Sequence, residues 1–167
     1  AGKIQAQLKS DHQHSALSLG HIAGIAENAG RKEARGQGYE VRTEAHGVMR
    51  ARGGMLVSTE GQPRLRSHIT DMPEALARLD EGRALQEGLS QAAQQALAQD
   101  AQDQAQTVQA LKDQNRGLRG TGRQAQPEQG MFPELADPHL VLASAAGLAA
   151  TSTAGTHWHA GEHLAVR

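Results

Sequence analysis

The chain has 167 residues, a formal net charge of −1, one residue each of Trp, Tyr and Phe, and no cysteine. The lack of cysteine excludes a disulfide framework and a thiolate metal site, and no run approaches the ~20 apolar residues of a membrane span. Because aromatic side chains supply the largest buried areas in globular cores, we expect the missing burial to come from association of identical chains.

Charge is unevenly distributed along the sequence. Basic residues are in excess over residues 1–70 and acidic residues over 71–137. The basic excess is small and is not interleaved with aromatic residues, so we expect no nucleic-acid partner. The first ten residues, AGKIQAQLKS, lack the apolar core of a signal peptide, so we expect no export by a conventional signal.

The first predicted elements are two short strands. Ile4, Ala6 and Leu8 alternate with polar residues, and the run ALSL at 16–19 follows a polar turn at 11–13. Residues 23–37 contain three glycines and the charged cluster RKEAR. This composition predicts an exposed loop.

The next stretch, residues 38–60, has the alternation of strands with one buried face. Tyr39, Val41 and Thr43 alternate with charged residues, and Met55 and Val57 repeat the pattern. Glycines separate these runs, which predicts short stacked β rungs joined at glycine corners. The predicted corners here are Gly38, Gly47, Gly53 and Gly54. Arg50 and Arg52 share a face, and we expect them to pair with Glu40 or Glu44 across a rung.

A helical insertion is predicted over residues 71–116. Asp71 is the expected N-cap, Pro73 fits the first turn, and Glu74 completes a capping box. Leu85 and Leu89 belong to an apolar stripe with helical spacing. One long helix and a hairpin of two helices both fit this pattern.

Glycines and prolines then predict a linker over residues 117–137, anchored by Phe132. Residues 138–167 repeat the strand pattern with predicted corners at Gly147, Gly155 and Gly161. The expected division is therefore a β-strand segment at 1–70, the insertion at 71–116, the linker at 117–137, and a continuation of the β-strand pattern at 138–167. The predicted fold class is mainly β, with short stacked β-helix-like or β-prism-like rungs and a long α-helical insertion.

Nine histidines raise the question of a metal site. His157 and His159 would share a face of a strand, and with His163 they form an H-x-H-x3-H pattern. Six imidazoles from three chains could bind one iron or zinc ion, and a metal-dependent hydrolase using these histidines is the alternative function. Isolated H-x-H spacing is a weak signal, so we expect ordinary polar or surface histidines, with no metal and no cofactor.

No catalytic motif is present in the sequence. There is no GxSxG elbow and no HExxH, because Glu162-His163 lacks its partner residues. The glycines never form a phosphate-binding GxxxxGK[ST] loop. We therefore predict no enzymatic activity and no catalytic residue.

The chain closely resembles the C-terminal part of VgrG, the spike protein of bacterial type VI secretion. Four stretches in the family's order carry the resemblance: LKSDHQHSALSLGHI, RGQGYEVRTEAHGVMRARGGMLVSTEG, HITDMPEALARLDEGRAL and HLVLASAAGLAATSTAGTHWHAGEHLAV. The resemblance implies a homotrimeric, needle-like β-structure at the tip of a contractile injection machine. It also implies that this is a fragment, with a phage-tail-like base before it and more spike after it.

The same resemblance implies the partners and the location. The expected partners are the secretion tube and tip proteins, together with an effector or its chaperone, for which residues 71–137 are the candidate docking region. The protein is expected in the bacterial cytoplasm first, and then secreted through the apparatus into the target cell or medium. It would cross the target membrane as part of the spike, without being an integral membrane protein.

Overall fold

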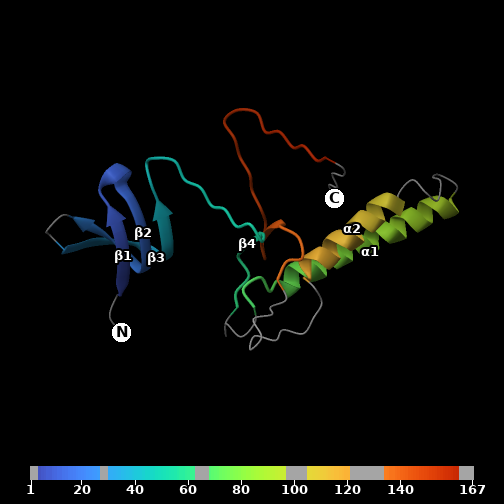
Figure 1. Ribbon diagram of the computed structural model, residues 1–167, viewed down its shortest axis with the longest axis horizontal. Coiled ribbons are helices and arrows are strands. Elements are labelled where there is room, and N and C mark those ends of the chain that lie inside the picture. Colours follow the sequence, from blue (N-terminus) through green and yellow to red (C-terminus); the bar gives the residue numbers. More distant parts are fainter. Residues whose placement is uncertain (1–3, 27–29, 63–67, 97–104, 121–133, 162–167) are drawn as a thin grey trace. The chain divides into compact units, whose positions relative to one another are not determined.

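The computed structural model describes residues 4–26, 30–62, 68–96, 105–120 and 134–161. The chain falls into two compact units, Ala1–Met49 and Arg50–Arg167 (Figure 1). The first unit is a three-stranded antiparallel sheet, and the second combines a two-stranded parallel sheet with two helices.

The sheet of the first unit has the strand order β1-β2-β3. Its strands are β1 (Gln5–Ser10), β2 (Ser15–Ala26) and β3 (Gly30–Arg42). A short 3-10 turn, η1 (His12–His14), joins the first two strands, and Gln13 within it has a φ of 52°. The prediction of two strands around a polar turn is confirmed.

The predicted loop at residues 23–37 is wrong. β2 continues to Ala26 and β3 begins at Gly30, so most of this stretch lies in paired strands. The register shifts between Ile22 and Ala23 and between Ala23 and Ile25. Such bulges allow glycine-rich strands to stay paired, and composition alone does not show this.

The second unit contains the parallel pair β4 (Met55–Ser58) and β5 (Leu140–Ala143). These strands come from the two separate copies of the strand pattern in the sequence. Met72, Ala75 and Ala143 form a buried cluster with the partly buried Leu56 and Val141. The base of the first helix is therefore packed on this sheet.

The helical insertion is a hairpin and not a single rod. Helices α1 (Pro73–Gln95) and α2 (Ala105–Leu118) lie side by side in Figure 1. Asn115 Nδ2 donates to Asp80 Oδ1 at 2.9 Å, and Lys112 Nζ lies 2.5 Å from Glu87 Oε1. Because the paired positions rise along α1 and fall along α2, the helices are antiparallel.

Two details of the helical prediction are wrong. The N-cap of α1 is Met72, without a side-chain cap, while Asp71 lies outside the helix and its carbonyl accepts a hydrogen bond from Gln62 Nε2 at 2.9 Å. Leu85 and Leu89 are each 57% exposed. α2 packs on a different face of α1, on which Ser90 is buried.

The predicted stacked rungs and trimer involve more than one chain. Residues 43–54 and 144–161 lie outside the strands and have no strand partner within the described ranges. Stacked rungs and a trimer therefore remain predictions. α2 continues to Leu118, two residues past the predicted end of the insertion. Most of the predicted linker, including Phe132, lies outside the described residues.

Candidate functional site

An exposed apolar face covers one side of the first unit's sheet. The register aligns Leu8 with Leu17 and Leu17 with Val41, and it aligns Leu19 with Tyr39. Tyr39 is 76% exposed and Val41 73%. Directly paired residues point to the same face of a sheet, so these side chains form one surface. The predicted alternation is present, but its apolar side is not buried within one chain.

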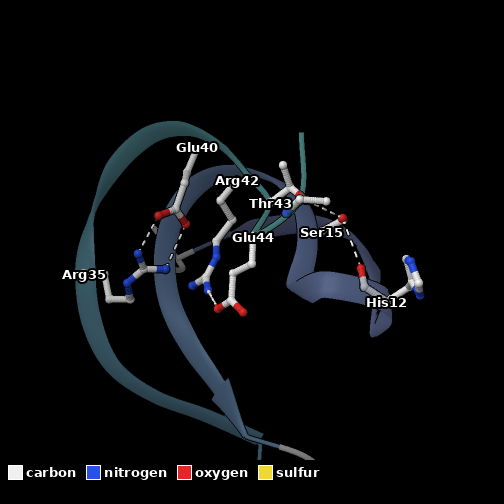
Figure 2. Close-up of polar contacts among 8 residues, drawn as sticks. His12, Ser15, Arg35, Glu40, Arg42, Thr43 and Glu44 are labelled. Atoms are coloured by element: carbon white, nitrogen blue, oxygen red, sulfur yellow. Dashed lines mark hydrogen bonds and ion pairs between the residues drawn. The ribbon is translucent and has the colours of Figure 1, made fainter. Parts of the chain in front are cut away.

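Polar contacts lie within β3 and between the start of β2 and the residue after β3 (Figure 2). Ser15 Oγ and Thr43 Oγ1 are hydrogen-bonded at 2.9 Å, which ties the start of β2 to the end of β3. Arg35 Nη1 donates to Glu40 Oε2 at 2.8 Å. The hydrogen bond from Arg35 lowers the pKa of the Glu40 carboxyl, and the same bond raises the pKa of Arg35.

Arg50 and Arg52 belong to the second unit, so their predicted pairing with Glu40 or Glu44 stays a prediction. Glu40 pairs with Arg35, and Glu44 lies 3.8 Å from Arg42 Nη2. Both pairs are local along the chain, and Gly38, with a φ of 124°, lies between Arg35 and Glu40 in β3.

A second exposed apolar face lies on the β4–β5 sheet. Met55 is paired with Leu140 and Val57 with Leu142, and these four side chains share a face. Leu140 and Leu142 are exposed, whereas Val141 on the opposite face packs against the helical base. One side of this small sheet is thus covered by the hairpin, and the other side is open.

Hydroxyl side chains stabilise the turns that end the strand runs. Ser58 Oγ accepts the N–H of Glu60 at 3.0 Å, and Ser152 Oγ accepts that of Ala154 at 3.2 Å. Ser144 Oγ accepts two such bonds, from Ala146 at 3.3 Å and from Gly147 at 3.2 Å. All three serines lie three residues before a glycine, at Gly61, Gly147 and Gly155. The S-x-x-G pattern is the sequence feature that accompanies these turns, and the strand alternation does not predict it. We call these turns the hydroxyl corners.

The predicted glycine corners have different environments. Gly38 and Gly54 have φ values of 124° and 109°, in the region that favours glycine. A Cβ on Gly54 would lie 2.5 Å from Leu135 Cδ1, whereas one on Gly47, Gly53 or Gly147 would meet nothing within 4 Å. A Cβ on Gly161 would also meet nothing, and one on Gly155 would lie 3.1 Å from His157 Nε2. The role of these glycines as corners between stacked rungs stays a prediction.

The candidate metal ligands lie in the exposed C-terminal run. His157 and His159 are both exposed, and His163 is outside the described residues. Within the described ranges, one chain brings together no group of three His, Asp or Glu side chains that could hold a metal ion. A search of the same residues finds no helix with the length and apolar character needed to cross a membrane.

Known proteins match this chain over most of its length. Residues 1–93 match the family described as type VI secretion system Rhs element Vgr, and residues 127–167 match an uncharacterized family conserved in bacteria. Two curated relatives are the type VI secretion system spike proteins VgrG2b and VgrG2a of Pseudomonas aeruginosa. Each is 34% identical over 97% of this chain, which spans 15% and 18% of their respective lengths.

Two solved structures share the fold. One is the VgrG spike from the type VI secretion system, with a TM-score of 0.70 and 24% identity over 98% of this chain and 53% of that chain. The other is the Tle1 effector bound to the VgrG spike, with a TM-score of 0.69 and 23% identity over 98% of this chain and 43% of that chain. Since the Vgr match alone covers more than half of the chain, the protein belongs to the Vgr family of type VI secretion system Rhs elements.

Proposed function

We propose that this chain is a structural segment of a type VI secretion spike and works as a homotrimer. The observation that carries the proposal is the pair of exposed apolar sheet faces, one in each compact unit. Exposed apolar surface of this kind marks interaction sites in soluble proteins. Membership in the Vgr family supplies the biological setting.

The extended runs support association for a second reason. Residues 43–54 and 144–161 have no strand partner within the described part of one chain. Backbone N–H and C=O groups that become buried need hydrogen-bond partners. Strands from neighbouring copies would supply these partners and would form the predicted rungs with corners at Gly38, Gly47, Gly53, Gly54, Gly147, Gly155 and Gly161.

In this proposal, residues 1–70 and 138–167 form the spike, residues 71–116 the helical insertion, and residues 117–137 its linker. The role is mechanical and not catalytic, with no cofactor and no nucleic-acid partner. The partners are the tube and tip proteins of the machine. The protein is made in the bacterial cytoplasm, leaves through the apparatus, and crosses the target membrane as part of the spike.

The insertion is the proposed docking surface for an effector or its chaperone. One similar structure is described as the Tle1 effector bound to a VgrG spike. In this chain, the outer surface of α1 between residues 84 and 96 exposes Leu85, Leu89 and small or amide side chains, without an exposed charged residue. An uncharged, partly apolar helix face suits a protein partner of similar character.

The solution mass of the chain tests the trimer. We expect static light scattering to give the mass of three chains. Val41→Gln should lower this mass, because it places a polar group on the apolar face of the first unit. Arg42→Gln is the matched control, since it introduces the same residue at the neighbouring position on the opposite face. A monomer mass for the unmodified chain would refute the proposal.

A further inference from the structure

One peptide bond at the base of the hairpin has a reactive composition. Of the five prolines in the sequence, one follows an aspartate, at Asp137–Pro138. The carboxyl of an aspartate can attack its own backbone carbonyl carbon and close a five-membered ring, which makes the attack intramolecular. The proline nitrogen belongs to a tertiary amide without an N–H, and it leaves as a secondary amine. An Asp–Pro bond is therefore easier to cleave than other peptide bonds.

The structure holds the backbone on both sides of this bond. Ala136 N donates to the carbonyl oxygen of Gly117 at 2.9 Å, and Met55 N donates to the carbonyl oxygen of His139 at 2.8 Å. The chain is thus attached to the end of α2 before the bond and to the start of β4 after it. A backbone that is already held in place loses less entropy when it reaches the geometry needed for reaction.

The carbonyl oxygen of the same bond already accepts a hydrogen bond. His139 N donates to Asp137 O at 2.7 Å, across Pro138. This oxygen gains negative charge when the carboxyl attacks its carbon, and a donor aimed at it stabilises that charge. The donor is a backbone N–H of a residue that β4 holds in place, so it needs no rearrangement at the moment of reaction.

Gly117 leaves room for the two side chains next to this bond. A Cβ on Gly117 would lie 3.0 Å from His139 Nε2 and 3.3 Å from Asp137 Oδ2. The imidazole and the carboxylate therefore approach the same point on α2. Both also line an open hollow, through which water can reach them. In the described part of the chain, the other charged side chains that line the hollows at His139 are Asp113 of α2 and Arg78 of α1.

We propose that the chain cleaves itself between Asp137 and Pro138 in mild acid. The protonated Asp137 carboxyl attacks its own backbone carbonyl carbon, the C–N bond to Pro138 breaks, and the carboxyl proton moves to the proline nitrogen. The product is a cyclic anhydride at Asp137, which one water molecule opens to two carboxyl groups. The reaction is a single event on the chain's own backbone. It needs no second copy, so it goes beyond the proposed function and does not depend on it.

The cut would change the attachment of the hairpin and not the sheet. β5 begins after the cleaved bond and is paired with β4, so backbone hydrogen bonds would keep the two pieces together. The end of α2 would lose its covalent link to β5, and the hairpin would be linked to β4 through α1 alone. Mild acid would thereby loosen the proposed docking surface while the strand pair stays intact.

Intact-mass spectrometry under denaturing conditions detects the fragments 1–137 and 138–167. The full chain is incubated at neutral pH and at the lowest pH at which circular dichroism still shows the folded protein. We expect the fragments to form in acid, at least about tenfold faster than in the same buffer with urea, because one oxyanion donor is worth about 10²–10³ in the rate of an enzyme. An equal rate in urea would indicate ordinary acid hydrolysis and would overturn the proposal, as would a lack of fragments.

Variants separate the carboxyl from its surroundings. Asp137→Asn removes the attacking group and should abolish the fragments. Gly117→Ala should slow their formation, because its Cβ would displace the imidazole and the carboxylate that approach Gly117. Gly88→Ala is the matched control in α1, since its Cβ would meet nothing within 4 Å. Equal cleavage rates in the two alanine variants, with the same helical signal, would overturn the assignment of the reaction to this site.

Discussion

Among the predicted corner glycines, Gly54 is the one whose replacement the structure forbids most clearly. Its φ is 109°, and a Cβ there would also lie 2.9 Å from the carbonyl oxygen of His139. Backbone atoms at this distance cannot move aside cheaply, because Met55 N donates to the same His139 oxygen at 2.8 Å. Gly54 thus lies close to His139 at the point where the pairing of β4 with β5 begins.

Gly54→Ala should destabilise the second unit by at least about 1–2 kcal/mol, the cost of the left-handed conformation alone. Gly47→Ala is the control, because its Cβ would meet nothing within 4 Å and its φ lies outside the left-handed region. Thermal unfolding followed by circular dichroism compares the two variants. Equal melting temperatures would contradict the proposed close approach.

Asn115 is a buried polar residue of the hairpin, with 3% of its surface exposed. Its amide donates to the Asp80 carboxylate, which also pairs with Arg119. Asn115→Leu should cost about 1–3 kcal/mol, because it leaves a partly buried carboxylate oxygen without its donor. Gln109→Leu is the control on the exposed side of α2, where the bond to Asp113 is solvent-accessible. Chemical unfolding monitored by helical signal should separate the two variants.

At the scale of elements, α1 and α2 are joined by charged pairs as well as apolar contacts. A hydrogen bond from Lys112 and its charge lower the pKa of the Glu87 carboxyl, and Arg83 adds to this effect. Because the pKa is lower in the folded state than the usual 4.5, the pair stabilises the hairpin above that pH. The stabilisation disappears as the pH falls through the folded-state pKa.

Glu87→Gln should therefore flatten the acid side of the hairpin's stability profile. We expect the melting temperature of the variant to fall less than that of the unmodified chain between about pH 6 and about pH 3. Glu81→Gln, exposed on the same helix, should leave the profile unchanged. An identical acid profile in all three proteins would show that the Lys112 pair contributes nothing to stability.

The exposure of Leu85 and Leu89 changes the expected effect of placing charges on α1. Since Leu85 and Leu89 are 57% exposed, Leu85→Asp with Leu89→Asp should keep most of the helical signal and the trimer mass. Leu118→Asp should instead disrupt the hairpin, because Leu118 is buried and an unpaired buried carboxylate is strongly unfavourable. Circular dichroism and light scattering measure both outcomes. Loss of helical signal in the double variant would place these leucines in a core.

The local patterns explain which elements could be predicted. The alternation of Met55 and Val57 predicted β4, and the run from Pro73 onwards predicted a helix. The partner of each strand could not be predicted, because alternation records which face is apolar and not which strand lies alongside. For the same reason the helical spacing of Leu85 and Leu89 predicts an apolar stripe but not the face on which α2 packs, which is that of Ser90.

At the scale of the whole molecule, the sequence composition agrees with the structure. A chain with one Trp, one Tyr and one Phe leaves its Tyr and Trp exposed. The composition predicts that apolar surface must be buried between chains. It does not predict where the two apolar faces lie, because they depend on the strand register, which aligns Leu17 with Val41 and Val57 with Leu142. The hydroxyl corners could not be predicted from the sequence, because S-x-x-G is too short a pattern to be specific.

The adjacency of β4 and β5 bears on how such spikes diversify. The backbone leaves the parallel pair after Ser58, which is paired with Ala143, and returns at Leu140, which is paired with Met55. The segment between is therefore a crossover whose two ends lie at opposite ends of a four-residue strand pair, and lengthening such a crossover adds little closure entropy. We therefore expect that the hairpin can be lengthened or replaced without a change in the pairing of β4 with β5.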